Sequence, residues 1–513
     1  MSAARVATST VTFRRFSDSS AGDADPRRWL ILATICTAAL MIVLDVTVMN
    51  LALPSAQRAL GFTNADRQWI VTAYALSFGS LLLFCGRLAD LIGRKATFLT
   101  GLAGFAAASA VGGASDSFTM LVTARACQGV FAALLAPSAL SLLATTFTDV
   151  KERGKAFGVY GAVAASGSGL GLLLGGALTS YLSWRWCLYV NLLFAAIGIT
   201  GGMLLLRRQP KTPGARLDVP GVAAVSGGMF CLVYGFANAA AHSWHTPSTW
   251  GFLAAGVTLL IVFAAWQRRA AHPLLPPRVI LDRNRGGAYL TMLIFGSALF
   301  GIFLFLIYYM QLNLGYSAVK SGAAIVPMVA VIGVMANVGN IKLMPRFGPK
   351  PLISFGLLVN AAGMAWLTRI GVHSGYAPAL LGPLMVTGFG SGLIFSAAAN
   401  TGTFGVAPRD AGIASASVNT GQQLGGAIGT ALLNTIAAGA FTSYLASHAG
   451  ARPAPQLIHL ALIHSYTTVF WWCAGIFAAG AIISGTLLRR GPLTRPGDIP
   501  AREPSRQAVA ARS

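Results

Sequence analysis

Charged residues are scarce in this chain, and acidic residues are the scarcest of them. Of 513 residues, 10% are charged and only 14 are Asp or Glu, whereas 55% are hydrophobic. A soluble domain carries about 25% charged residues, so the composition excludes a soluble globular protein. Deep within the long apolar segments we place a single carboxylate, Asp45. Because an ionised acid in lipid is costly and usually faces a cavity, Asp45 is a candidate functional residue; the alternative is a structural acid tied to a neighbouring helix.

Sequence motifs of enzymatic chemistry are also missing. The chain has no GxxxxGK[ST] phosphate loop, which argues against ATP as the energy source and against a nucleotide partner. It has neither HExxH nor GxSxG. The six cysteines lie in apolar runs without pairing or ligand spacing: Cys36, Cys85, Cys127, Cys187, Cys231 and Cys473. We therefore predict no enzyme, no cofactor, no disulfide and no metal site.

Long apolar runs dominate what is present. A spanning helix needs about 20 mostly apolar residues, and fourteen runs meet this length. They cover residues 29–52, 68–88, 97–115, 119–144, 157–181, 186–206, 221–241, 249–267, 286–312, 320–341, 351–370, 378–401, 411–437 and 464–488. Residues 438–463 are expected to be the longest external loop. An even number of spans places both termini on one side of the membrane.

The charge distribution fixes the orientation. The net charge is +23, from 37 Lys and Arg residues. If both termini are cytoplasmic, Arg125 lies inside a span and nearly all the other cations face the cytoplasm; the exceptions are Arg58, Arg67, Arg185, Lys320, Arg369 and Arg452. This asymmetry follows the positive-inside rule and predicts an inner-membrane protein. The excess of Lys and Arg is thus explained by membrane topology, and no nucleic-acid partner is predicted.

Two polar breaks with clustered Pro and Arg, residues 207–219 and 267–285, divide the chain. We predict a disordered cytoplasmic tail over 1–28 and a six-helix bundle over 29–206. A linker with two extra transmembrane helices follows over 207–285, then a second six-helix bundle over 286–488 and a cytoplasmic tail over 489–513. Transporters are often built from such repeats, with the substrate site between the halves.

A short basic loop joins the second and third spans and reads GRLADLIGRK. Its glycines, Gly86 and Gly93, allow a tight reversal, and Arg94 and Lys95 hold the loop on the cytoplasmic face. Asp90 is an acid among these cations at a helix end. An ordinary basic turn explains the cations but not the ordered pattern of Gly, Asp, Gly and Arg.

Together with LDVTVMNLALP at residues 44–54, this loop resembles the major facilitator superfamily, in particular the fourteen-span drug:proton antiporters of bacteria. Further similar segments are LVTARACQG, GLLLGGAL, WRWCLYVN, YYMQLNLGYSAVKSGAAIVP and AGIASASVNTGQQLGGAIGTALL. The resemblance implies an all-α polytopic fold of two six-helix bundles with a two-helix insert, working as a monomer. Two departures stand out, because Leu172 and Leu193 occupy positions where the family usually has proline. The loss of these helix-distorting prolines could alter gating and the coupling of transport to protons.

Asp45 and Arg125 are predicted to lie at similar depth. Asp45 lies about 24 Å along its span from Trp29, and Arg125 about 10 Å below Phe118 on a span running the other way. In a core of about 30 Å both fall in the outer half. A pair, direct or through Gln128, would make both charges bearable. Protonation of Asp45 could then release Arg125 or a cationic substrate; the alternative is that Arg125 is a static tether.

The loop acid has a predicted partner. In relatives it is thought to brace the cytoplasmic side, so we expect Asp90 to act as a latch against the start of the 411–437 span, where a helix N-terminus holds an anion. The second half has a weaker copy of the loop, IKLMPRFGPK, with Pro345 in place of the acid. The latch charge is therefore expected only in the first half.

Glycines in the fifth span, Gly167, Gly171, Gly175 and Gly176, predict close helix packing, or an interface that moves during gating. Polar and aromatic residues of the spans are candidates for the substrate cavity. We favour Gln128, Tyr309, Gln311, Asn419, Gln422 and Gln423; Asn191, Asn400, Tyr74, Phe303 and Tyr308 are further candidates.

The resulting prediction is proton-coupled efflux of small lipophilic compounds, cationic ones included, by alternating access. A small-molecule substrate, protons and membrane lipid are the predicted partners. Two alternatives stay open, namely a facilitator or importer of a small polar metabolite, and a membrane enzyme or sensor that transports nothing.

Overall fold

The computed structural model describes residues 26–62, 64–207, 217–241, 244, 246–270, 273–372, 374–407, 410–448 and 454–493. Fourteen helices in these ranges are long and apolar enough to cross a membrane, and no strand occurs among the described residues. The predicted all-α class and the number of spans are confirmed. The predicted tails, 1–28 and 489–513, lie mostly outside the described residues.

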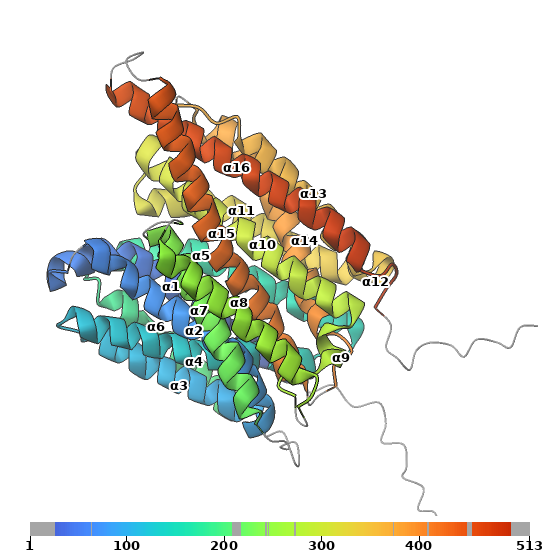
Figure 1. The fold of residues 1–513 in the computed structure, drawn as a ribbon. Coiled ribbons are helices and arrows are strands. Elements are labelled where there is room, and N and C mark those ends of the chain that lie inside the picture. The colour runs from blue at the N-terminus through green and yellow to red at the C-terminus, as the bar shows by residue number, and fades with distance from the viewer. Residues whose placement is uncertain are drawn as a thin grey trace, which may run out of the picture.

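The helices fall into three groups along the chain (Figure 1). The first is α1 (Arg28–Leu60), α2 (Asn64–Ile92), α3 (Arg94–Gly113), α4 (Phe118–Thr146), α5 (Val150–Tyr181) and α6 (Trp186–Leu205). The insert is α7 (Val219–Ala241) and α8 (Pro247–Gln267), followed by the short α9 (Pro277–Ile280). The last is α10 (Arg283–Tyr308), η1 (Tyr309–Asn313), α11 (Ala318–Val338), η2 (Gly339–Leu343), α12 (Met344–Phe347), α13 (Pro349–Leu367), η3 (Ala377–Leu381), α14 (Gly382–Thr403), α15 (Ala411–Ser447) and α16 (Ala454–Leu487).

Helices of the first and last groups pack mainly within their own group, which we call the N-half and the C-half. In the N-half, α4 packs on α2 and α3, and α1 packs on α5 and α6. In the C-half, α10 packs on α15, and α13 packs on α14 and α16. The halves meet chiefly where α5 contacts α11 and where α2 contacts α15. Further contacts between the halves join α4 to α15 and α5 to α14.

Residues 438–463 are not the long loop that we expected. Helix α15 continues to Ser447 and α16 already begins at Ala454, as the red end of the chain in Figure 1 shows. Hydropathy marks where lipid surrounds a helix, whereas a helix continues beyond the bilayer as long as no residue breaks it. In the same way α1 runs through Pro54 to Leu60 and ends at Gly61, which adopts a left-handed conformation with φ 70°.

The insert lies across the contact between the halves. A buried cluster joins Leu83 of α2, Met229 of α7, Phe263 of α8 and Ile413 of α15. Helix α7 contacts both α2 and α15. Asp218, just before α7, holds the insert together by accepting hydrogen bonds from the Trp266 indole (2.8 Å) and the Gln267 amide (2.7 Å). The insert therefore contacts both halves rather than standing apart from them.

Both described ends of the chain lie at one face of the molecule. Arg28, at the start of α1, forms an ion pair with Glu152 at the start of α5 (2.6 Å). The next residue, Arg153, lines a small cavity with Pro492 and Leu493, near the last described position. We call this the basic face and the opposite side the far face.

Candidate functional site

Asp45 lies at the centre of a buried polar cluster inside the N-half. Its side chain is fully buried, and Arg125 of α4 donates to its Oδ2 at 2.5 Å. Its Oδ1 accepts hydrogen bonds from the amides of Gln128 (3.1 Å) and Asn191 of α6 (2.7 Å). Gln128 also donates to the hydroxyl of Ser109 on α3 at 2.7 Å. Four helices thus converge on one carboxylate, and the expected contact between Asp45 and Arg125 is present.

Arg125 is held by groups other than the acid. Its Nη1 also donates to Gln128 Oε1 at 2.8 Å, and its Nε donates to the backbone carbonyl of Ile70 on α2 at 3.4 Å. The guanidinium carbon stands 4.5 Å from the centre of the Tyr74 ring, a cation–π arrangement. Arg125 therefore has three contacts besides its ion pair with Asp45.

Two buried oxygen atoms of the cluster have no hydrogen-bond partner among the described residues. They are the hydroxyl of Tyr74 and the carbonyl oxygen of Asn191. Buried polar atoms are normally satisfied by protein or by ordered water. Both atoms belong to residues that contact Arg125 or Asp45. Tyr74 and Asn191 thus each have an oxygen atom near Asp45 or Arg125 that could form a further hydrogen bond.

A second site lies where α2 meets α15, at the basic face. Asp90 accepts hydrogen bonds from the backbone N–H groups of Gly412 (2.9 Å) and Ile413 (3.3 Å), in the first turn of α15. Arg94 also donates to Asp90, at 3.4 Å. The first N–H groups of a helix lack partners within the helix and attract negative charge. The carboxylate therefore bridges the two halves at the position we predicted for it.

The other residues of the loop motif have separate places. Gly93 adopts a positive φ of 105° between α2 and α3, so the tight turn requires glycine. Gly86 lies against Gly412. Lys95, which we grouped with the latch, instead donates to the carbonyls of Met203 (3.0 Å) and Leu206 at the end of α6. It caps a helix of its own half and does not reach α15.

The sequence reasoning missed a second polar contact between the halves, which joins α5 to α14. Arg153, buried at the start of α5, donates at 2.8 Å to Asn400 and Thr403 near the end of α14, and to the carbonyl of Ala144 on α4. Here a cation lies against helix C-terminal ends, which carry partial negative charge. Pro345, where the first loop has its acid, indicated only that the second half lacks the same carboxylate, so it did not identify Arg153.

The structure places the six favoured cavity residues on three elements, namely α4, η1 and α15, and their role in a cavity stays a prediction. Gln128 belongs to the Asp45 cluster. Tyr309 is completely buried within the C-half, where its hydroxyl donates to the carbonyls of Gly371 (3.0 Å) and Ser374 (3.2 Å). Asn419 donates to the Ser415 carbonyl within α15. The others, Gln311, Gln422 and Gln423, are half-buried.

Three of the four predicted glycines form one stripe against α1. Side chains added at Gly167 and Gly175 would come within 3.0 Å of Val43 and Val48, and one at Gly171 would overlap Thr47. The fourth, Gly176, is buried. The stripe brings α5 close to the part of α1 that carries Asp45. It packs two helices of one half, and a role in gating stays a prediction.

The fold and the two sites describe a helical membrane transport protein, and comparison with known sequences gives its family. The chain belongs to the Major Facilitator Superfamily, whose model matches residues 35–430. Among solved structures it is similar to the human organic anion transporter MFSD10 (TM-score 0.63, 15% identity, 90% of this chain and 100% of that one). It is also similar to the proton:xylose symporter XylE (TM-score 0.62, 14% identity, 92% and 98%).

Sequence relatives are antibiotic resistance and export proteins. The puromycin resistance protein pur8 of Streptomyces alboniger is 46% identical over 90% of this chain and 92% of its own length. The cephamycin export protein CmcT of Amycolatopsis lactamdurans is 39% identical, over 82% and 87%. The lincomycin resistance protein of Streptomyces lincolnensis is 30% identical, over 84% and 89%. The protein is thus a multi-pass membrane transporter whose relatives include proteins named for antibiotic resistance and export.

Proposed function

We propose that the protein exports small lipophilic compounds, antibiotics and related metabolites among them, in exchange for protons. The names of its relatives support export as the direction and antibiotics as the substrate class. The buried pair of Asp45 and Arg125 is the observation that carries proton coupling. The protein works as a monomer in the cytoplasmic membrane, with its basic face towards the cytoplasm in accordance with the positive-inside rule.

Exchange follows from competition for one negative charge. Protonation of Asp45 removes the charge that Arg125 neutralises, and the guanidinium keeps its contacts to Ile70 and Tyr74. A positive charge is then left without its counter-ion, which disfavours a cationic substrate nearby until the proton leaves. The proton gradient supplies about 1.4 kcal/mol per pH unit. The membrane potential adds about 2.3 kcal/mol per charge and 100 mV.

Alternating access follows from two contacts that lie at the same face. Asp90 joins α2 to α15, and Arg153 joins α5 to α14. Both contacts cross between the halves at the basic face and must break before that face can open. They therefore stabilise one of two states, and a ligand shifts the balance only by binding the two states differently. We assign the structure to the state closed towards the cytoplasm.

Dye accumulation in cells tests the proposal. Cells that express the protein should accumulate less of a lipophilic dye than cells without it, and a protonophore should abolish the difference. Asp45→Asn should also abolish it, while the protein stays folded and present in the membrane. Asp116→Asn is the matched control, because Asp116 is an exposed acid outside the spans. Equilibration of the dye that does not depend on the proton gradient would indicate a facilitator instead. Normal pumping by Asp45→Asn would contradict the role of Asp45 in proton coupling.

A further inference from the structure

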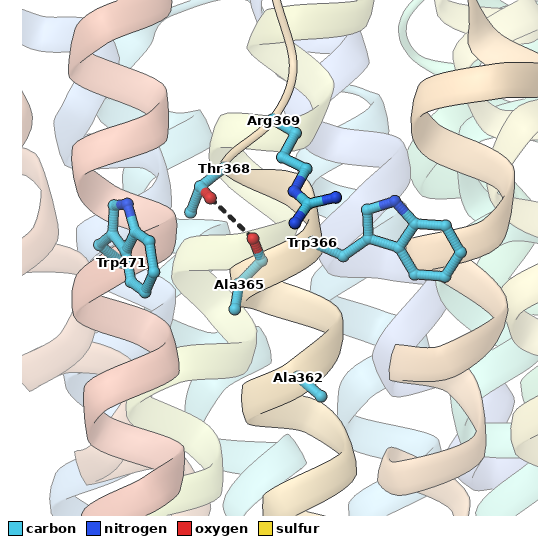
Figure 2. Close-up of a pocket in the computed structure, with 6 residues that line it drawn as sticks. All are labelled: Ala362, Ala365, Trp366, Thr368, Arg369 and Trp471. Atoms are coloured by element: carbon cyan, nitrogen blue, oxygen red, sulfur yellow. Dashed lines mark hydrogen bonds between the residues drawn. The ribbon is translucent and has the colours of Figure 1, made fainter.

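A groove opens on the outer surface of the C-half, over α13 and beside α16. Its volume is about 450 Å³, and it is lined by Ala362, Ala365, Trp366, Thr368, Arg369 and Trp471. In Figure 2 the two indole rings lie on opposite sides of α13, Trp471 on α16 and Trp366 turned towards Gly382 at the start of α14, with Ala362 and Ala365 of α13 between them. Trp366 is 45% exposed and Trp471 61% exposed, so both rings are open to whatever surrounds the protein.

The groove lies at the edge of the hydrocarbon layer, towards the far face. Trp366 is about 26 Å along α13 from Pro349 at the basic face, at 1.5 Å per residue. Trp471 is about 24 Å along α16 from Leu487 at the same face. In a core of about 30 Å both rings therefore stand near the far boundary, where lipid headgroups meet acyl chains. Arg369 follows the end of α13 and places its charge at this boundary.

Arg369 differs from the other far-face cations whose side chains the structure describes. Arg185 donates to the carbonyls of Gly113 and Ser115, and Arg58 donates to Ser55. Lys320 stands 3.9 Å from the centre of the Tyr316 ring. The guanidinium of Arg369 has no hydrogen bond, ion pair or ring contact with any described residue, and in the view of Figure 2 it lies between the two indoles.

We propose that this groove binds one phospholipid with an anionic headgroup in the far leaflet. The phosphate accepts hydrogen bonds from Arg369, and an acyl chain lies over Ala362 and Ala365 between the two indole rings. An unpaired cation at the headgroup level supplies the charge complementarity, and the apolar walls suit a chain that continues into the bilayer. The lining residues belong to the C-half, whereas Asp45, Asp90 and Arg153 belong to helices of the N-half, so the site does not depend on the proposed export function.

Fluorescence quenching by brominated lipid tests the proposal on the full-length protein. The protein is reconstituted in phosphatidylcholine vesicles that contain a minor fraction of phosphatidylglycerol. Bromine is placed on the acyl chains of one lipid or the other at equal mole fraction. Bromine on phosphatidylglycerol should quench more, with a preference of about 5-fold for the site, equivalent to ~1 kcal/mol. The paired change W366F and W471F should remove this extra quenching, because it removes the two reporters.

Arg369→Gln should reduce the preference to one, whereas Arg369→Lys should retain most of it. Lys320→Gln is the matched control, since it removes a far-face cation that already has an aromatic partner. Inorganic phosphate, compared with chloride at equal ionic strength, should not displace the lipid. Equal quenching by both lipids in the unsubstituted protein would mean ordinary boundary lipid only. The proposal would be overturned by that result, by a lipid preference that persists in Arg369→Gln, or by displacement of the lipid by inorganic phosphate.

Discussion

Gly86 of α2 and Gly412 of α15 face each other at the basic face, backbone against backbone. A Cβ atom added to Gly412 would lie 2.7 Å from Asp90 Oδ1 and would also overlap the Gly86 carbonyl oxygen. The contact between the halves therefore requires glycine on both sides. Because Asp90 bonds to the N–H of this same Gly412, the packing and the polar contact support each other.

Gly412→Ala should destabilise the closed basic face. Overpacking of a tight contact costs about 1–3 kcal/mol, and 2 kcal/mol changes the ratio of two states roughly 30-fold. We expect efflux to fall several-fold while the protein remains folded. Gly439→Ala, in the same helix, is the control, because no atom lies within 4 Å of the added Cβ. Dye efflux and the reactivity of a cysteine introduced at the interface measure the two effects, and equal behaviour of both variants would contradict the role of this contact.

Asp45 and Arg125 should behave as one unit in stability measurements. Removal of one partner from a buried ion pair costs about 3–5 kcal/mol, because the other charge is left uncompensated. Asp45→Asn and Arg125→Gln should each lower the unfolding midpoint of the purified protein. The double variant should be more stable than the sum of the single effects predicts.

The control for this cycle is the more exposed pair of Arg28 and Glu152. Surface pairs contribute about 0–1 kcal/mol, so Glu152→Gln should change the midpoint little. Strictly additive effects of Asp45→Asn and Arg125→Gln would mean that the two side chains do not interact in the membrane. None of the three cluster variants should pump against a gradient.

Arg153 should act as a second lock that is independent of Asp90. Arg153→Gln removes contacts to Asn400, Thr403 and Ala144, which use Nε, Nη2 and Nη1 of the guanidinium. Arg153→Lys cannot replace all three, because its donors lie on a single nitrogen and do not match the planar fork. Both variants should open the basic face more often, and the combination with Asp90→Asn should open it further than either change alone.

Labelling of a cysteine at the basic face by a membrane-impermeant reagent, in inside-out vesicles, measures this opening. Lys155→Gln is the control, since Lys155 is exposed and lies over the Trp29 ring rather than against the C-half. Unchanged labelling in Arg153→Gln would show that this contact does not hold the halves together.

The spans and the pair of charged residues could be predicted because lipid restricts what a sequence can do there. Apolar length identifies a spanning helix, and the cost of burying Asp45 requires a partner such as Arg125. The position of Asp90 followed from the resemblance of its loop to a family motif. The same physics gives no information on helix ends beyond the bilayer, so the extension of α15 to Ser447 was missed.

The cavity residues stay a prediction, because polarity within a span has several causes. Gln128 serves the Asp45 cluster, and the buried hydroxyl of Tyr309 is satisfied by backbone carbonyls of its own half. Ser109 was missed because a small hydroxyl gives no signal in an apolar run. Such assignments depend on which helices face one another, and a single sequence taken alone does not contain that information.

The attachment of the insert should depend on pH through Asp218. Burial raises the pKa of this carboxyl, but hydrogen bonds from Trp266, Gly221 and Gln267 outweigh it, so the pKa lies below its usual value. A lowered pKa in the folded protein stabilises the fold at neutral pH. This contribution is present above the unfolded value of about 3.9, and it is lost as the pH falls through the folded value.

Asp218→Ala should therefore lower the unfolding midpoint at neutral pH. It leaves buried hydrogen-bond donors without an acceptor, which costs about 1–3 kcal/mol. Asp218→Asn keeps one acceptor oxygen and should have a smaller effect. The difference between the unsubstituted protein and Asp218→Asn should shrink as the pH is lowered below about 4. Thermal unfolding at a series of pH values measures this difference, with Asp116→Asn as the exposed control. A difference that stays constant down to the lowest pH would show that the negative charge of Asp218 does not stabilise the insert. The arrangement of its hydrogen bonds alone would then account for the effect.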